Sequence, residues 1–127
     1  MSLKVKSKIE GVVQLFRGLD EHGGVQFVIL FGSSVMGYRN VMSDIDLAVG
    51  YEGDERERFD FRVQVSGELP QEFDIQIFQD LPLYLKKEVL KGEVLYMRNR
   101  REMYEIALET IRDYDFFEPV LLDYIQR

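Results

Sequence analysis

The 127-residue chain contains no cysteine and a single histidine, His22. Disulfide bonds and thiolate metal sites are therefore excluded, and so is a zinc site built on several imidazoles. Any metal ion bound by this chain must be held mainly by carboxylate oxygens. Such a ligand set favours a hard ion, Mg²⁺ or Mn²⁺.

Long apolar runs are also missing. No stretch reaches the roughly 20 apolar residues of a membrane span, and the lysine-containing N-terminal segment lacks the apolar core of a secretory signal. We therefore expect a cytoplasmic protein without membrane contact. The net charge of −7 argues against strong binding to nucleic-acid phosphates.

The order of periodic segments predicts one α/β (α+β) domain spanning residues 1–127, with a small mixed β-sheet and helices packed on it. Continuous or alternating apolar runs predict four strands, over residues 25–31, 44–50, 73–78 and 93–97. The last of these runs is short, and we expect it at an edge of the sheet.

Helical spacing of apolar residues predicts helices over residues 3–21, 82–90 and from about 99 to the C-terminus. Asn99 and Glu102 form a capping-box pattern at the start of the last segment, and Pro119 is expected to open a second helical piece within it. The acidic stretch 51–60 is interpreted as a surface loop. Residues 59–65 alternate in a way that favours a strand, with a short crossover helix as an open alternative.

The middle of the chain carries a pattern with chemical meaning. The first predicted strand ends in Gly32-Ser33, a turn that can present backbone N–H groups to a phosphate. After ten further residues, Asp44 and Asp46 alternate with apolar residues, which places both carboxylates on one face of a strand, about 7 Å apart at Cα. Asp74 belongs to a third predicted strand. Three strand-borne carboxylates beside such a turn suit two-metal phosphoryl transfer, whereas two solvated acids on an edge strand are the alternative interpretation.

The stretch GSSVMGYRNVMSDIDLAV, residues 32–49, resembles the signature of the DNA polymerase beta-like nucleotidyltransferase superfamily. The short chain resembles its minimal nucleotidyltransferase branch, which includes MntA-like antitoxins. The family's Gly-Ser, its later Gly and its Ser-Asp-x-Asp fall on Gly32, Ser33, Gly37, Ser43, Asp44 and Asp46. Its third acid falls on Asp74. The resemblance covers about residues 25–80 and extends loosely over Lys91–Tyr96.

This resemblance implies the nucleotidyltransferase fold and transfer of a nucleoside monophosphate from an NTP to a hydroxyl. Asp44, Asp46 and Asp74 would then be the catalytic and metal-binding residues. The first two would hold two Mg²⁺ ions, and Asp74 would contact one ion and orient the attacking hydroxyl. The residues implied to bind the nucleotide are Gly32, Ser33, Ser43 and Arg39.

One position departs from the family pattern. Many relatives carry an arginine where this chain has Met36, so a phosphate contact is missing unless Arg39 or a lysine from residues 86–91 replaces it. The departure bears on turnover more than on nucleotide binding.

Relatives in the minimal branch are commonly antitoxins encoded beside a HEPN-domain toxin, which they silence by transferring AMP from ATP to a toxin tyrosine. The resemblance therefore implies a Mg²⁺-dependent adenylyltransferase that acts on a HEPN partner docked by the C-terminal helices. Two alternatives stay open. One is transfer to a small molecule such as an aminoglycoside, for which the chain would have to dimerise to build an acceptor pocket. The other is a binding module that inhibits its partner sterically.

Overall fold

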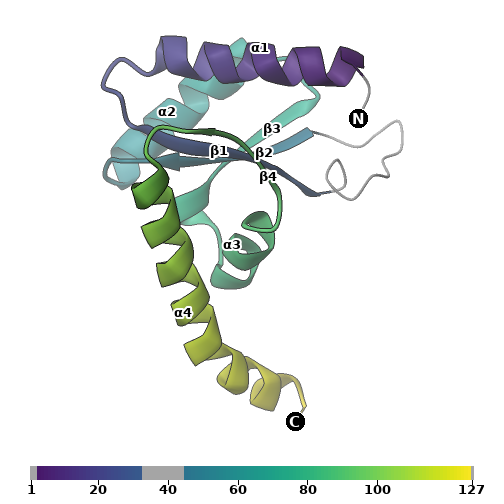
Figure 1. Cartoon of the computed structure of the whole chain (residues 1–127), viewed down its shortest axis with the longest axis vertical. Coiled ribbons are helices and arrows are strands. Elements are labelled where there is room, and N and C mark those ends of the chain that lie inside the picture. Colours follow the sequence, from purple (N-terminus) through teal and green to yellow (C-terminus); the bar gives the residue numbers. More distant parts are fainter. Residues whose placement is uncertain (1–2, 33–44, 127) are drawn as a thin grey trace.

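Four strands form one sheet in the order β3-β2-β1-β4 in the computed structural model, which describes residues 3–32 and 45–126 (Figure 1). The strands are β1 (Val25–Phe31), β2 (Ile45–Tyr51), β3 (Phe73–Ile77) and β4 (Glu93–Met97). β1 pairs antiparallel with β2 and with β4, whereas β2 and β3 are parallel. The predicted mixed sheet is confirmed, and β4 occupies an edge as expected.

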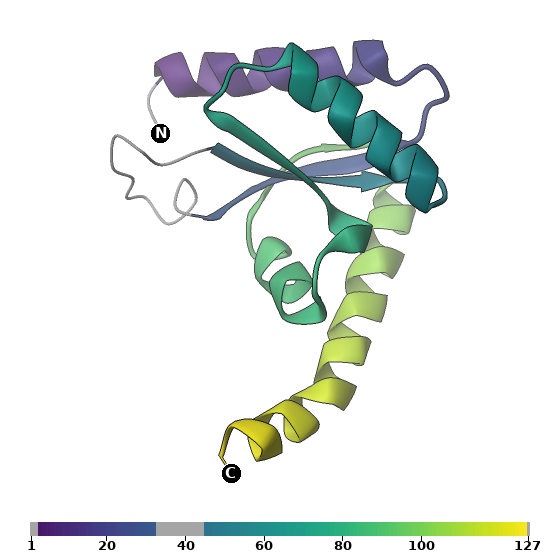
Figure 2. The same ribbon diagram turned by 180° about the vertical axis from the view of Figure 1, so that it is seen from behind.

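Helices cover both faces of this sheet (Figures 1 and 2). One face, here called the α1/α2 face, is covered by α1 (Leu3–Leu19) and α2 (Glu55–Glu68). The opposite face, the α3/α4 face, is covered by the 3₁₀ turn η2 (Phe78–Asp80), by α3 (Leu83–Val89) and by the first half of α4 (Arg100–Ile125). The N-terminal helix and the helix before β4 thus lie where the sequence predicts them, within two residues at each end.

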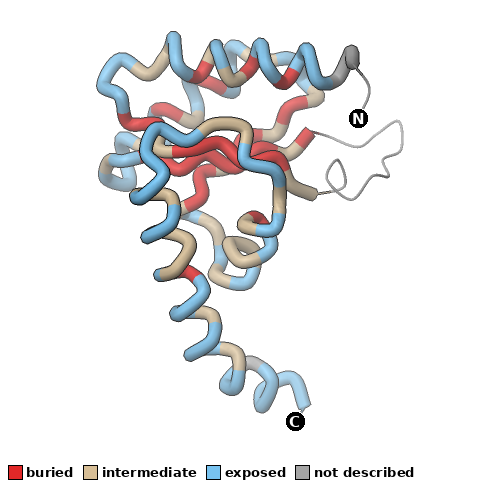
Figure 3. The backbone as a smooth tube through the Cα atoms, viewed as in Figure 1, coloured by how far each residue is buried: buried red, intermediate tan, exposed pale blue. Residues whose placement is uncertain are grey.

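Alternate strand residues build a separate core on each face. On the α1/α2 face, Leu47 of β2 packs with Phe16 of α1 and Val65 of α2, all with no exposed surface. On the α3/α4 face, Phe27 of β1 packs edge-on against Phe78, with ring centroids 5.2 Å apart. Strands β1, β2 and β3 are therefore the most buried part of the chain, as Figure 3 shows, whereas the edge strand β4 has no buried residue. Burial on both faces holds the strands in fixed positions.

Residues 55–68 form α2, so the predicted loop ends at Asp54 and the strand interpretation of residues 59–65 is wrong. Asp54 caps the helix by accepting a hydrogen bond from the Glu57 backbone N–H (2.8 Å), and Glu57 accepts one from the Asp54 N–H (3.1 Å). Phe61 and Val65, four residues apart, are the side chains that α2 buries. The neighbouring parallel strands β2 and β3 need a crossover connection, and an α-helix is its usual form.

The last helix, α4, is continuous over 26 residues and contains Pro119, so the predicted break at this proline is wrong. Proline removes one helical hydrogen bond, and the carbonyl that loses its donor belongs to exposed Asp115, where water can replace it. The predicted N-cap is confirmed, because Asn99 Oδ1 accepts from the Glu102 N–H at 3.0 Å, whereas the Glu102 carboxylate accepts from Arg98. Neither α4 nor any other described helix has the apolar length that crossing a membrane requires.

Candidate active site

Asp46 of β2 and Asp74 of β3 are register partners in the parallel pair, so two of the three predicted carboxylates stand side by side. Neighbouring strands lie about 4.8 Å apart. The residues on either side of each aspartate point into the α1/α2 core, so both carboxylates lie on the α3/α4 face. Both side chains are half-buried. The strand pairing brings together two acids that are distant in the sequence.

Gly32 follows the last residue of β1 and lies against Asp46. Its φ of +82° is a left-handed conformation that other residues rarely adopt. A Cβ placed on Gly32 would lie 3.3 Å from Asp46 Cγ and would collide with Asp46 Oδ2. Glycine therefore keeps the space beside this carboxylate open, which explains why the turn and the acid occur together.

Four predicted site residues, Ser33, Arg39, Ser43 and Asp44, lie outside the described residues, and their roles stay predictions. The segment that carries them connects Gly32 to Ile45. Phe31, just before this segment, pairs with Asp46, and Ile45 pairs with Phe73 beside Asp74. Both ends of the segment are thus anchored at the end of the sheet where the carboxylates stand.

The carboxylate oxygens at this end of the sheet are ligands that suit a hard divalent cation. Asp46 and Asp74 supply acceptor-only oxygens, and the missing Cβ of Gly32 leaves room beside one of them. Within residues 3–32 and 45–126, no three carboxylate or imidazole groups converge closely enough to hold an ion. The pair would need further oxygen ligands, and Asp44, two positions before Asp46, is the predicted source.

Gln76 is a further polar residue of this site that the motif does not include. Its Nε2 donates to Asp74 Oδ1 at 3.2 Å and to Oδ2 at 3.3 Å. Gln76 lies two residues after Asp74 and shares its face of β3, so the alternation of FDIQIF is the sequence signal that could have identified it.

The lysines considered as a replacement for the missing phosphate contact lie on or just after α3, which covers the same face of the sheet as the carboxylates. Lys86 Nζ lies 5.7 Å from the centroid of the Phe78 ring, and Lys87 Nζ lies 4.0 Å from that of Tyr114. Lys91 pairs with Glu88 at 3.0 Å. In the described structure these lysines contact aromatic rings and an acid of their own helix, and their predicted role at the phosphate is not tested.

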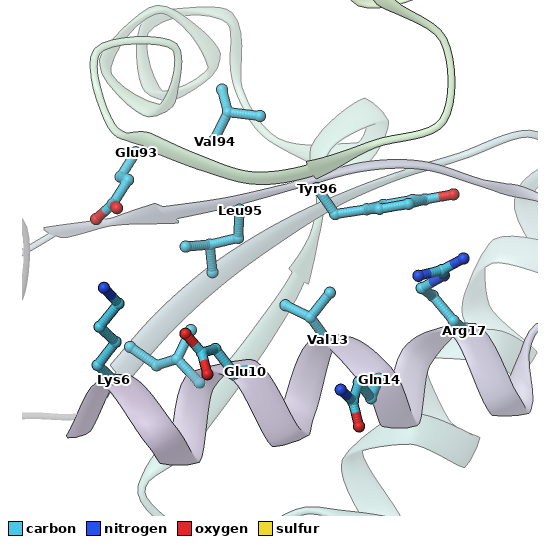
Figure 4. Close-up of a pocket in the computed structure, with 10 residues that line it drawn as sticks. Lys6, Glu10, Val13, Gln14, Arg17, Glu93, Val94, Leu95 and Tyr96 are labelled. Atoms are coloured by element: carbon cyan, nitrogen blue, oxygen red, sulfur yellow. The ribbon is translucent and has the colours of Figure 1, made fainter. Parts of the chain in front are cut away.

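A groove of about 650 Å³ lies between α1 and β4 (Figure 4). Leu95 and Tyr96 of β4 form one side, with Val13 and Arg17 of α1 opposite them, and the Arg17 guanidinium lies 5.4 Å from the Tyr96 ring centroid. The groove belongs to the α1/α2 face, whereas the carboxylates lie on the other face of the sheet. It is therefore separate from the candidate active site.

Residues 14–101 match the sequence profile of the protein family described as "Polymerase beta, Nucleotidyltransferase". A protein of Methanocaldococcus jannaschii named "Putative protein adenylyltransferase MJ1547" is 31% identical over 78 residues, which are 61% of this chain and 60% of that protein. The match thus spans about three-fifths of the length of this relative.

Solved structures share the fold. A toxin–antitoxin complex with AMP-PNP contains a chain with a TM-score of 0.69 at 22% identity, over 95% of this chain and 98% of that one. The complex of a tri-AMPylated Shewanella oneidensis HEPN toxin with MNT antitoxin contains a chain with a TM-score of 0.69 at 20% identity. The match covers 96% of this chain and 98% of that one. A structure described as a "putative minimal nucleotidyltransferase" has a TM-score of 0.54 at 26% identity. The match covers 76% of this chain and 97% of that one.

The expected fold class is thereby confirmed. The family profile covers most of the chain and includes Gly32, Asp46 and Asp74. This chain therefore belongs to the polymerase beta nucleotidyltransferase family.

Proposed function

We propose that this enzyme transfers AMP from ATP, with Mg²⁺, to a hydroxyl group of a HEPN-domain partner protein and thereby acts as an antitoxin in the cytoplasm, where ATP is available. The observation that carries the proposal is the register pairing of Asp46 and Asp74 beside Gly32. Support for the acceptor comes from the relatives, which include a named protein adenylyltransferase and structures of antitoxins with HEPN toxins.

In the proposed reaction, the acceptor oxygen forms a bond to the α-phosphorus of ATP, and the bond from that phosphorus to the leaving pyrophosphate breaks. Asp44, Asp46 and Asp74 would hold the metal ions, which would neutralise charge on the phosphates and help to align the reacting oxygens. Asp74 orients the acceptor hydroxyl and receives its proton. Gly32 and Ser33 bind the triphosphate through backbone N–H and hydroxyl groups.

The second half of α4 supplies a surface that suits a protein acceptor. Phe116, Val120 and Tyr124 follow one another at four-residue spacing, and their exposed fractions are 85%, 62% and 75%. This part of α4 projects away from the sheet (Figure 2). An apolar stripe on a projecting helix is typical of a protein-binding surface. α4 begins on the same face of the sheet as the two carboxylates, so a partner docked on this stripe approaches from their side.

The proposal is tested with the HEPN-domain protein encoded beside this chain, Mg²⁺ and ATP labelled at the α-phosphate. We expect AMP label on the partner, and we expect Asp46→Asn and Asp74→Asn to lower the labelling rate on the order of 10²-fold or more. Asp60→Asn is the matched control, because this aspartate is exposed on α2 and pairs only with Arg56 among the ion pairs of the described residues. Its labelling rate should equal that of the wild type.

Three outcomes would contradict the proposal. Label that persists in both aspartate variants would remove the carboxylates from the reaction. Tight partner binding without label in the wild type would indicate a steric inhibitor. Transfer of AMP to an aminoglycoside by the chain alone would favour the small-molecule alternative.

Docking is tested separately by calorimetry with the same partner. Phe116→Ala should weaken binding about tenfold or more, since large aromatic residues dominate protein interfaces. Phe59→Ala is the control, because Phe59 is also exposed, at 58%, but lies on α2 over the other face of the sheet. Equal affinities of the two variants would exclude the α4 stripe as the docking surface.

A further inference from the structure

Gln76 occupies the border between an apolar cluster and the carboxylates. On the α3/α4 face, β3 presents Asp74 and then Gln76, and the chain continues into Phe78 of the buried cluster. The register partner of Gln76 on β2 is Ala48, whose small, fully buried side chain belongs to the same cluster. Packing alone would favour an apolar residue at this position. The amide is therefore best explained by the group to which it donates.

That group is the Asp74 carboxylate, with Nε2 of Gln76 at 3.2 and 3.3 Å from its two oxygens. An aspartate on a strand can rotate about its side-chain bonds, and a fixed donor restricts this rotation. Because the Nε2 nitrogen lies within hydrogen-bond distance of both oxygens, either oxygen can bind a cation while the other keeps the hydrogen bond. Donors of this kind orient metal-binding carboxylates in many metal sites.

We propose that Gln76 is a positioning residue that holds the Asp74 carboxylate in place for metal binding and catalysis. The inference rests on the proposed function, because it assumes that Asp74 binds a metal ion. In this role Gln76 would contact neither the metal ion nor the substrate. Its effect must therefore pass entirely through Asp74.

The first test measures metal binding without any reaction. Binding of Mn²⁺ to the full chain is followed by the electron paramagnetic resonance signal of the free ion. Gln76→Met keeps the length of the side chain and removes the donor, and we expect the Kd for Mn²⁺ to rise about tenfold. Gln76→His places an N–H at nearly the same distance from the backbone and should stay within about threefold of the wild type. Gln64→Met, on an exposed position of α2, is the matched control and should change nothing.

The second test measures transfer to the partner. Gln76→Met should lower kcat about tenfold and leave the KM for ATP within about twofold, since the triphosphate contacts are made elsewhere. In a chain that already carries Asp74→Asn, adding Gln76→Met should have no further effect on Mn²⁺ binding. Non-additivity of this kind is expected when one residue acts only through another.

The outcomes separate the two proposals. If Asp74→Asn weakens Mn²⁺ binding and Gln76→Met does not, the positioning role is overturned and the proposed function stands. If Asp74→Asn also leaves Mn²⁺ binding unchanged, both are overturned. Should Gln76→Met fail to fold, Gln76→His and Gln76→Ala decide the question. The variant that retains a donor should preserve Mn²⁺ affinity and the variant without one should reduce it, and equal affinities would refute the inference.

Discussion

The two faces of the sheet are made by alternate residues of the same strands, yet they have different chemistry. On the α1/α2 face, β2 and β3 present only apolar side chains, and Leu47 and Ile75 are 0% and 2% exposed. On the α3/α4 face, the same strands present Asp46, Asp74 and Gln76, all half-buried. One face supplies the stability that holds the other in position.

The difference follows from the lengths of the covering helices. α1 and α2 are 17 and 14 residues long and cover β2 and β3 on their face, whereas α3 has 7 residues and α4 packs on the sheet only with its first half (Figures 1 and 2). The α3/α4 face is therefore closed over its middle, and the carboxylates at its end keep contact with solvent. A rigid strand with one sealed face and one half-open face is a suitable support for a catalytic pair.

The largest expected change in unfolding free energy comes from comparing substitutions at two adjacent residues of β2. Leu47→Ala creates a cavity in the sealed core and should lower the free energy of unfolding by about 3 kcal/mol. Asp46→Asn, one residue before it, should change the free energy of unfolding by less than about 0.5 kcal/mol, because it lies on the half-open face. Urea denaturation of the two variants measures both values. Similar losses would show that the two faces are equally closed.

The next effect concerns the glycine beside Asp46. Gly32→Ala forces a Cβ into a left-handed conformation and against the Asp46 carboxylate, so we expect a loss of about 1–2 kcal/mol in unfolding free energy together with slower AMP transfer. Gly67→Ala is the matched control, since Gly67 lies in α2 with open space around its Cα. That variant should be as stable as the wild type or more stable by up to about 1 kcal/mol. A neutral Gly32→Ala would contradict the tight contact.

A smaller effect tests the other end of the α3/α4 face, where Arg98 holds the first turn of α4. Arg98 donates to Glu102 at 2.9 and 2.7 Å, and these bonds lower the pKa of the Glu102 carboxyl below its ordinary value of 4.5, against the opposing effect of burial. A carboxyl whose pKa is lower in the folded state stabilises the fold above its unfolded pKa, and this contribution is lost as the pH falls through the folded pKa.

Arg98→Met should therefore lower the free energy of unfolding by about 1 kcal/mol at neutral pH. This difference from the wild type should shrink as the pH falls below about 4.5. Thermal unfolding of both proteins at a series of pH values measures this difference in stability. Arg101→Met is the control, because the Arg101–Glu105 pair is 3.5 Å long and largely exposed, so its removal should have almost no effect at any pH. A pH-independent cost of Arg98→Met would assign its role to the Gly23 carbonyl, which it also contacts.

The smallest effect is expected at the end of α4. Phe116→Ala should leave the unfolding free energy of the isolated chain within about 0.5 kcal/mol, because the ring is 85% exposed. A larger loss that depends on protein concentration would show that this part of α4 already packs against a second copy.

Local patterns in the sequence predicted most elements because local chemistry determines them. Continuous or alternating apolar runs identified the strands, and the Asn99 cap identified the start of α4. Residues 59–65 favoured a strand and left a crossover helix open because Phe59, Phe61, Val63 and Val65 fit both a period of two and a helical i, i+4 pair; the structure shows the helix. The Asp54-x-x-Glu57 cap was the signal that could have decided between them. The prediction at Pro119 was wrong because proline removes only one helical hydrogen bond here, and the exposed Asp115 carbonyl that loses its donor can bond to water instead.

The candidate site likewise has features that local sequence determines and features that only the tertiary structure determines. The order of residues alone established that Asp46 and Asp74 belong to strands and that glycine ends the strand before them, because these properties depend on near neighbours. Only the tertiary structure decided that β3 lies parallel to β2 in the register that sets Asp74 opposite Asp46, and that Gln76 donates to it. Strand order and register depend on burying both cores at once, and no local stretch of sequence contains that information.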